Sequence, residues 1–215
     1  MNKWIDKTKF QALIKEGQSI MVGGFLTCGT PELLIDYIVE TNIKDLTIIC
    51  NDAGYPDKGV GKLISNNQVK KLIATHIGTN PTVSKLMNEG KIDVELIPQG
   101  TFIEQIRAKG GGLGGILTPT GIHTPVEIGK KKITIDGKEY IVAEAFGADL
   151  AIINAYFSDY LGNLTYSGTA RNFNPIMATA ADYVVALIHE EVKHIDPEHV
   201  ITPHIFVDSI IGGAI

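Results

Sequence analysis

Residues 21–31 read Met21-Val22-Gly23-Gly24-Phe25-Leu26-Thr27-Cys28-Gly29-Thr30-Pro31. The apolar run at residues 19–22 predicts a short buried strand, and the two glycines after it let the backbone turn where a side chain would clash. Thr30 is a good N-cap and Pro31 suits the first position of a following helix. A helix that starts beside a bare glycine backbone exposes N–H donors, which favours an anionic or carbonyl-bearing ligand. The alternative is an ordinary strand-to-helix connection.

The rest of the chain alternates apolar runs with helical segments. Strands are expected at residues 19–22, 46–50, 72–76, 94–97, 149–156 and 183–189, and helices at 6–16, 31–40, 82–89 and 102–109. Thr101 and Glu104 have the spacing of a capping box at the start of the last of these helices, and Asn174 with Pro175 can cap and open another short one. The alternation predicts an α/β fold with an open, mostly parallel sheet flanked by helices.

The middle of the chain departs from this alternation. Residues 110–121 include six glycines, which indicates a functional or interface loop, with a merely tolerant surface connection as the alternative. Asp136-Gly137 stands between strand-forming residues and predicts a β-hairpin excursion. Because no repeat, low-complexity tract or linker marks a boundary, residues 1–215 are expected to form a single domain.

Composition limits the possible partners. The 215 residues are 44% hydrophobic and 20% charged, as in a globular protein with a substantial core. A net charge of −5 without a basic block argues against nucleic acid, and no apolar run approaches the length of a membrane span. The N-terminus lacks the apolar core of a signal peptide, so we expect a cytoplasmic protein in which Cys28 and Cys50 are reduced.

Two side-chain amides are the main polar candidates for a site. Asn51 and Gln99 each follow an expected strand, at the edge where open α/β sheets place their ligand crevice. Their amides donate and accept without titrating, which suits the positioning of a carboxylate or a thioester carbonyl, although turn capping is a competing role. Cys28 has no positioned His–Asp set beside it in sequence, so a structural thiol near a ligand is favoured over a nucleophile.

The histidines do not indicate chemistry of their own. His76 ends an expected strand and is read as a core or crevice residue rather than a general base. His189 and His194 are five residues apart, whereas two zinc ligands on one helix face are four apart, and Pro197 interrupts any helix there. No metal site is therefore expected.

A longer pattern identifies a resemblance. The turn at residues 23–31 lacks the Lys-Ser/Thr ending of a P-loop and the G-x-G-x-x-G spacing of a dinucleotide-binding motif. Together with later motifs it is similar to the α subunit of family I coenzyme A transferases, which include acetate and butyrate–acetoacetate CoA-transferases. The match extends in one order over nearly the whole chain, through Asn51-Asp52, residues 76–81, Pro98-Gln99-Gly100-Thr101, and residues 110–121, 162–166 and 171–175.

This resemblance implies coenzyme A and acyl-CoA as substrates, with no permanently bound cofactor. It implies contact with coenzyme A through Gly24, Phe25, Leu26, Thr27, Cys28, Gly29 and Thr30. It also implies a ping-pong reaction in which a glutamate forms a mixed anhydride and then a glutamyl-CoA thioester, before a second carboxylic acid takes the coenzyme A. Short-chain acids such as acetate, butyrate and acetoacetate are the expected acyl groups.

In the family, the glutamate belongs to a Ser-Glu-Asn-Gly motif of the β subunit. That motif is absent from this sequence, so the resemblance predicts a catalytically incomplete chain that requires a β partner in an αβ or α2β2 assembly. Residues 110–121 are the candidate for a segment at or near the interface between the α and β subunits. Arg171 could pair with a phosphate of coenzyme A or with a subunit partner. Two other readings stay open: a sugar-phosphate isomerase-like or ligand-sensing domain of related fold, and a non-catalytic assembly subunit.

Overall fold

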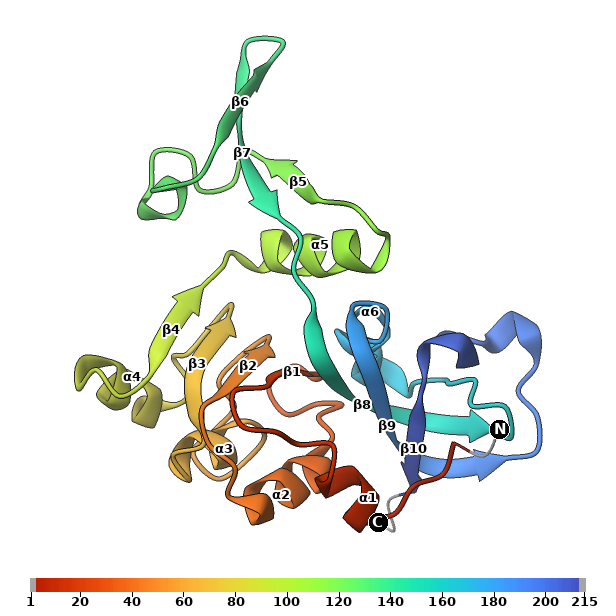
Figure 1. Ribbon diagram of the computed structural model, residues 1–215. Coiled ribbons are helices and arrows are strands. Elements are labelled where there is room, and N and C mark those ends of the chain that lie inside the picture. The colour runs from red at the N-terminus through yellow and green to blue at the C-terminus, as the bar shows by residue number, and fades with distance from the viewer. Residues whose placement is uncertain (1–2, 213–215) are drawn as a thin grey trace.

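The structure is a computed structural model that describes residues 3–212. Its largest element is a seven-stranded sheet in the order β10-β9-β8-β1-β2-β3-β4 (Figure 1). Every neighbouring pair in this sheet is parallel, which confirms the expected fold class. The strands are β1 Ser19–Val22, β2 Leu46–Cys50, β3 Val69–Ala74, β4 Asp93–Leu96, β8 Ala148–Asp159, β9 Ala181–Val192 and β10 Ser209–Gly212.

Helices cover both faces of the sheet. The α-helices are α1 Lys7–Gln11, α2 Glu32–Thr41, α3 Gly61–Ser65, α4 Pro81–Asn88, α5 Gln99–Gly110 and α6 Asn174–Met177. Short 3₁₀ turns are η1 Pro125–Glu127, η2 Gly168–Arg171, η3 Pro197–His199 and η4 His204–Phe206. The helices α1, α2 and α3 lie on one side of the sheet, and α5 and α6 lie on the other (Figure 1). None of the helices within residues 3–212 is long and apolar enough to cross a membrane.

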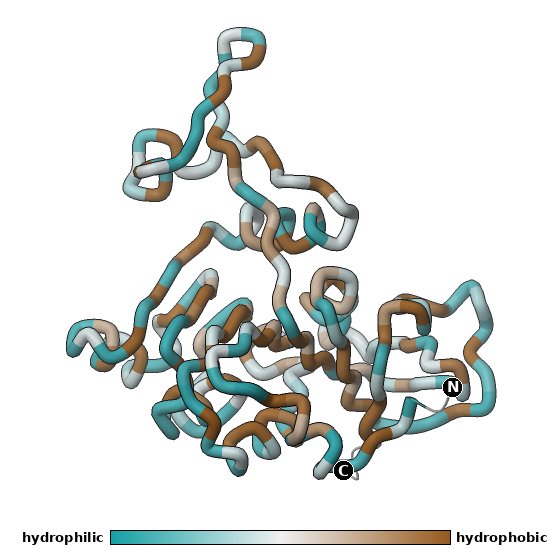
Figure 2. The backbone as a smooth tube through the Cα atoms, in the orientation of Figure 1, coloured by the Kyte–Doolittle hydropathy of each residue, from teal (hydrophilic) through white to brown (hydrophobic). Residues whose placement is uncertain are grey.

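Strand residues alternate between two hydrophobic cores. Ile20 and Val22 of β1 pack with Leu34 of α2, whereas Met21, between them, packs with Phe102 of α5 on the opposite face. A strand that is covered on both faces needs apolar residues at nearly every position, and β1 and β2 are accordingly apolar except at Ser19 and Thr47. Figure 2 shows hydrophobic stretches in brown within the main sheet. The burial of each such side chain contributes about 1.5–3 kcal/mol relative to an exposed one.

A small antiparallel sheet projects from this body (Figure 1). It consists of β5 Gly115–Thr118, β7 Lys138–Glu144 and β6 Lys132–Ile135, in that spatial order. Asp136 and Gly137 form the two-residue turn between β6 and β7 with φ of 50° and 74°, as a type I′ turn requires. The expected hairpin is therefore confirmed. Residues 110–121 are not a plain loop, because part of them forms β5.

The chain order in the main sheet changes direction at β1. Strands β1 to β4 follow one another toward one edge, and β8 then returns beside β1 and starts the series toward the other edge. Open α/β sheets bind ligands outside the carboxyl ends of their strands at such a switch point. The glycine turn that follows β1 lies at this place.

Several expected boundaries are wrong. The helix expected at 6–16 ends at Gln11, and β3 begins at Val69 and ends at Ala74 rather than covering 72–76. The short helix α3 was not expected, because its five residues are too few to show a period. The strand at the sheet edge, β4, is largely exposed, since no further strand covers its outer side.

Three expected helix caps are also wrong. The helix α2 begins at Glu32 with Pro31 at its N-cap, and Thr30 makes no side-chain cap. The helix α5 begins at Gln99, which places Thr101 inside the helix and removes the capping box. Asn174 lies inside α6 and does not cap it, because its amide is engaged elsewhere, as described below.

Candidate functional site

Four loops meet at the carboxyl edge of β1, β2, β3 and β4. They are the glycine turn at residues 23–30, Asn51-Asp52 after β2, Thr75-His76 after β3, and the start of α5 at Gln99. Together they surround an open cleft. Its lining residues are Phe25, Leu26, Asn51, Asp52, Thr75, His76, Thr79 and Gln99. The structure therefore brings together the glycine turn and the two amides that the sequence singled out.

At Gly23 and Gly24, the first two residues of the glycine turn, the packing leaves no room for a side chain. A Cβ on Gly23 would lie 1.8 Å from Asn174 Oδ1, and one on Gly24 would lie 2.1 Å from Thr30 Oγ1. Gly24 also has a φ of +120°, which other residues rarely adopt. Within residues 3–212, the backbone N–H groups of Gly24, Thr27 and Gly29 have no hydrogen-bond acceptor. The turn can thus offer bare N–H donors to a ligand.

The tip of the turn is strained. Phe25 and Cys28 exchange two backbone hydrogen bonds of 3.0 and 2.9 Å across a two-residue loop. The two residues in that loop, Leu26 and Thr27, have φ of 45° and 69°, which is costly for side chains larger than glycine. The backbone N–H of Leu26 donates to Asp52 Oδ2 at 2.8 Å, which ties the strained tip to the loop after β2.

Asn174 holds the other side of the glycine turn. Its Nδ2 donates to the carbonyl oxygens of Gly29, at 2.9 Å, and Ala170, at 2.8 Å, while its Oδ1 accepts from the N–H of Asn154 at 2.9 Å. This fully buried amide links the turn to η2 and to β8. Sequence reasoning treated Asn174 as a helix cap because its partners are remote in the chain.

The structure joins Asn51 and Gln99 directly. Gln99 Nε2 donates to Asn51 Oδ1 at 3.0 Å. Thr75 Oγ1 lies 3.1 Å from the same oxygen and 2.8 Å from the backbone carbonyl oxygen of Asn51, so its hydroxyl donates to this residue. Asn51 is 3% exposed, whereas Gln99 is exposed at the rim of the cleft. Asn51 follows β2 and Gln99 follows β4, as expected, and their hydrogen bond places them in one cluster.

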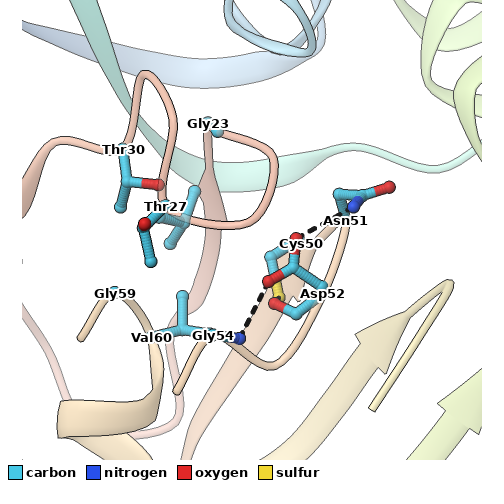
Figure 3. A pocket seen from close by; sticks show the side chains of 11 residues that line it. Gly23, Thr27, Thr30, Cys50, Asn51, Asp52, Gly54, Gly59 and Val60 are labelled. Atoms are coloured by element: carbon cyan, nitrogen blue, oxygen red, sulfur yellow. Dashed lines mark hydrogen bonds between the residues drawn. The ribbon is translucent and has the colours of Figure 1, made fainter. Parts of the chain in front are cut away.

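Asp52 was missed as a site residue. Its carboxylate is buried and accepts from Asn51 Nδ2, from Leu26 N and from Gly54 N, at 2.8–2.9 Å. Figure 3 shows it between Asn51 and Gly54, beside a small cavity that the glycine turn also lines. The signals in the sequence were its position next to Asn51 and its place in the Asn51-Asp52 motif of the family resemblance, and neither gave it a role of its own.

An acidic residue near the turn is already paired. Glu32 Oε1 accepts from the N–H of Gly59 at 2.8 Å, and its Oε2 lies 2.6 Å from Lys62 Nζ. Burial lowers the pKa of Lys62, but hydrogen bonds to Asp36 and Glu32 outweigh that effect, so its pKa is raised. The charge of Glu32, which would oppose an anion at the turn, is therefore offset by a neighbouring cation.

The other candidates occupy separate places. Cys28 is exposed with its Sγ 3.1 Å from Thr169 Oγ1, and Cys50 is buried; both are free thiols, as expected. Burial, together with the nearby charge of Asp52, raises the pKa of Cys50 well above its usual value, so this thiol is a poor nucleophile. His76 is exposed at the cleft, which agrees with the crevice alternative of the sequence reading and not with the core one. Within residues 3–212, no cluster of His, Cys, Asp and Glu could hold a metal ion.

Three further features that the sequence analysis named lie outside this cleft. His189 stacks on Tyr156 with ring centroids 4.9 Å apart, at the ends of β8 and β9. The glycine-rich segment 110–121 connects α5 to the projecting sheet. Arg171 lies in η2, close to the residues that hold the glycine turn, but it is not among the lining residues.

Comparison with known protein sequences gives close matches. A family model described as coenzyme A transferase matches residues 7–213. The chain is 48% identical over 213 residues to acetate CoA-transferase subunit alpha of Escherichia coli (strain K12), which covers 95% of this chain and 97% of that protein. It is 49% identical over 212 residues to the acetoacetyl-CoA:acetate/butyrate CoA transferase alpha subunit of Clostridium acetobutylicum, covering 98% and 97%.

Solved structures share the fold. Glutaconate coenzyme A-transferase from Acidaminococcus fermentans superposes with a TM-score of 0.85 at 22% identity, covering 97% of this chain and 74% of that one. An acyl-CoA transferase from E. coli O157:H7, solved as a thioester complex with CoA, gives a TM-score of 0.85 at 22% identity. This chain is covered over 99% of its length and spans 47% of that longer protein.

Proposed function

The chain belongs to the coenzyme A transferase family, and on that premise we propose that it is the α subunit of a heteromeric CoA-transferase. The enzyme would move coenzyme A between a short-chain acyl-CoA and a carboxylic acid such as acetate, butyrate or acetoacetate. The observation that carries this proposal is the near-full-length identity of 48–49% to two α subunits whose names state that activity. The family assignment argues against a sugar-phosphate isomerase-like or ligand-sensing domain.

The glycine turn is proposed to hold the pantetheine arm of coenzyme A. The free N–H groups of Gly24, Thr27 and Gly29 suit the amide carbonyls of that arm, and the absence of a Cβ at Gly24 lets it approach the backbone. Phe25 and Leu26 are 39% and 40% exposed at the cleft and could cover apolar parts of the ligand. The remaining turn residues, Cys28 and Thr30, are proposed to shape the site.

Asn51 and Gln99 are proposed to position the reacting oxygen. A thioester carbonyl that is attacked by a carboxylate develops negative charge on its oxygen, and N–H donors aimed at that oxygen lower the barrier. The two amides share one hydrogen bond and face the cleft beside the glycine turn. They would thus act as supporting groups rather than as nucleophiles.

The nucleophile is proposed to come from a β subunit. No glutamate is among the residues that line the cleft in the described part of the chain, and its one carboxylate, Asp52, is buried under three hydrogen bonds. A glutamate of the partner would attack the acyl-CoA carbonyl and expel the coenzyme A thiolate, leaving a mixed anhydride. The thiolate then attacks the glutamyl carbonyl and releases the first carboxylate. The second carboxylate then attacks the glutamyl thioester and expels the coenzyme A thiolate, which forms a new mixed anhydride. The thiolate attacks the acyl carbonyl of that anhydride, which gives the new acyl-CoA and frees the glutamate.

The assembly follows from this division of roles. We infer that residues 1–215 act as one α-subunit domain in an αβ or α2β2 complex, with the active site between the subunits. Coenzyme A is then a substrate rather than a resident cofactor. A cytoplasmic location is proposed, because acyl-CoA thioesters and their acids are metabolites of the cell interior.

Reconstitution tests the proposal. The chain is purified alone and together with a β subunit that carries Ser-Glu-Asn-Gly, and the transfer of coenzyme A from acetyl-CoA to butyrate or acetoacetate is measured. We expect no transfer by the chain alone, transfer by the complex, and loss of transfer when the partner's motif glutamate is replaced by glutamine. Undiminished transfer by the single chain, or none by the complex, would refute the proposal.

A further inference from the structure

Asp52 has an unusual setting for a charged side chain. It is 7% exposed, and within residues 3–212 it forms no ion pair with a cation. Its oxygens accept N–H groups from three places: the strained turn tip at Leu26, the neighbouring Asn51 amide, and the backbone of Gly54. A buried carboxylate is costly unless such donors surround it, so these three contacts are what stabilise it.

The carboxylate sets the direction of the amide cluster. A carboxylate only accepts hydrogen bonds, so Asn51 must turn its NH₂ group toward Asp52, where Nδ2 lies 2.9 Å from Oδ2. The oxygen of Asn51 then faces the opposite way and accepts from Thr75 Oγ1 and Gln99 Nε2. The chain of donors thus runs from Gln99 through Asn51 to Asp52.

This direction decides what Asn51 can offer to the cleft. Its Oδ1 accepts from the amide of Gln99 and faces the hydroxyl of Thr75, whose single hydrogen is shared with the backbone carbonyl oxygen of Asn51. Its Nδ2 has two hydrogens and donates one of them, to Asp52, among the residues that the structure describes. The group that Asn51 has left for the cleft is therefore an N–H, because its oxygen is turned toward Gln99 and Thr75, and an N–H suits an oxygen of a carbonyl or carboxylate.

We propose that Asp52 is a positioning residue that fixes Asn51 as a hydrogen-bond donor to the reacting oxygen and holds the glycine turn beside it. The inference rests on the proposed function, because it assigns Asn51 to an oxygen of the substrate. Both carboxylate oxygens of Asp52 are engaged by N–H groups of the protein. It acts through Asn51 and through the backbone of Leu26.

The test combines substitutions at both positions in the complex with the β subunit. Asp52→Ala removes the acceptor, so we expect kcat to fall about 10-fold to 100-fold because Asn51 is no longer oriented, and the KM for acyl-CoA to rise because the turn at Leu26 is released. In an Asn51→Ala background, the same Asp52→Ala substitution should lower kcat by less than about threefold, since the amide that it orients is already gone, while the rise in KM remains. Equal falls in kcat in both backgrounds would overturn the proposal, as would an unchanged kcat.

A matched variant separates positioning from general destabilisation. Asp159 is 1% exposed and accepts hydrogen bonds from the backbone N–H groups of Leu161, Gly162 and Asn163, in a loop outside the cleft. Asp159→Ala should lower the melting temperature without a fall in kcat at a temperature where the complex is folded. A fall in kcat as large as that of Asp52→Ala would overturn the proposal. If Asp52→Ala does not fold, the nearly isosteric Asp52→Asn takes its place in the same cycle.

A second readout does not need activity. Side-chain ¹⁵N resonances of Asn51 and Gln99 in the full chain report their hydrogen bonds, so Asp52→Asn should shift the Asn51 amide protons and speed their exchange with water, while Asp159→Asn should not. Unchanged Asn51 resonances in Asp52→Asn would refute the orienting role. If the wild-type complex transfers no coenzyme A but these resonances shift, the proposed function fails and the orienting role of Asp52 stands.

Discussion

Substitution of Gly24 by alanine is the most direct test of how the glycine turn is built. Gly24 has a φ of +120°, and a Cβ there would lie 2.1 Å from Thr30 Oγ1 and 3.1 Å from the Cα and Cβ of Thr30. The nearest obstacle is thus a side-chain oxygen, and the next two are atoms that the backbone holds in place. Both the conformation and the space oppose any residue other than glycine.

The expected loss of stability has two parts. A residue with a Cβ at positive φ costs about 1–2 kcal/mol. Forcing an extra carbon into a filled site costs about 1–3 kcal/mol more. Gly24→Ala should therefore lower the free energy of unfolding by about 2–5 kcal/mol. Gly17→Ala is the matched control: Gly17 has a φ of +74°, but no heavy atom lies within 4 Å of the place that its Cβ would occupy, so only the first part applies.

Urea unfolding, followed by circular dichroism, measures these differences. Thr30→Ala removes the nearest obstacle, so the double variant Gly24→Ala/Thr30→Ala should be more stable than the sum of the two single effects predicts, by about 1 kcal/mol or more. The backbone part would remain. For binding, Gly24→Ala should weaken the affinity of the complex for coenzyme A by about 10-fold, or about 1.4 kcal/mol, in a calorimetric titration.

Two results would refute this reasoning. One is a loss of stability in Gly24→Ala no larger than that in Gly17→Ala, which would mean that the packing against Thr30 has no energetic consequence. The other is additivity of the Gly24 and Thr30 effects within about 0.5 kcal/mol. Unchanged affinity for coenzyme A would leave the packing argument intact and would remove the proposed contact between ligand and turn.

Four further outcomes are expected. Asn51→Ala and Gln99→Ala should each lower kcat of the complex about 10²-fold or more, and full activity of both would leave the chain only a scaffolding role. Asn174→Ala leaves the carbonyl groups of Gly29 and Ala170 and the N–H of Asn154 without their hydrogen-bond partner. The free energy of unfolding should therefore fall by about 3 kcal/mol, against about 1 kcal/mol for Asn172→Ala, whose side chain is less buried. Equal losses in the two variants would contradict the role assigned to Asn174. Titration with Ellman's reagent should find Cys28 reactive in the native chain and Cys50 reactive only after unfolding, because burial shields Cys50 and raises its pKa. Reaction of both thiols in the native chain would be inconsistent with the structure. Burial opposes the ionisation of Asp159, but hydrogen bonds from Asn163 and Leu161 outweigh this effect and lower its pKa. The stability that Asp159 contributes is therefore complete above about pH 4, the unfolded value, and is lost as the pH falls through the lower folded pKa. Asp159→Asn should weaken this acid dependence of urea unfolding, and an identical pH profile of the variant and the wild type would count against the assignment.

The elements that sequence reasoning located correctly share a physical basis. The strands β1 and β2 and the hairpin at Asp136-Gly137 are specified by local signals: an unbroken apolar run, or two turn residues that tolerate positive φ. The caps failed for the opposite reason. Thr30, Thr101 and Asn174 all have side chains that can cap a helix, but α2 begins after Pro31 and α5 after Pro98. The amide of Asn174 is taken up by Gly29 and Asn154, which are remote in sequence.

The site shows the same division. Asn51 and Gln99 could be named because each follows a strand, and parallel strands bring their carboxyl ends to one edge. Asp52 and Asn174 could not be named, since their importance lies in donors and acceptors contributed by Leu26, Gly29 and Asn154, which have no fixed spacing from them in the chain.

The amino-acid sequence by itself determined the class of fold, the glycine turn with its exposed donors, the family resemblance and the absence of the Ser-Glu-Asn-Gly motif, because strand periods and motifs are local and can be read along the chain. The tertiary structure alone decided that the turn at Leu26 and Thr27 is strained, that Asp52 restrains it, and that Asn51 points its N–H in one direction. Hydrogen bonds between distant segments have a donor and an acceptor whose pairing depends on folded geometry, and no local pattern encodes that geometry.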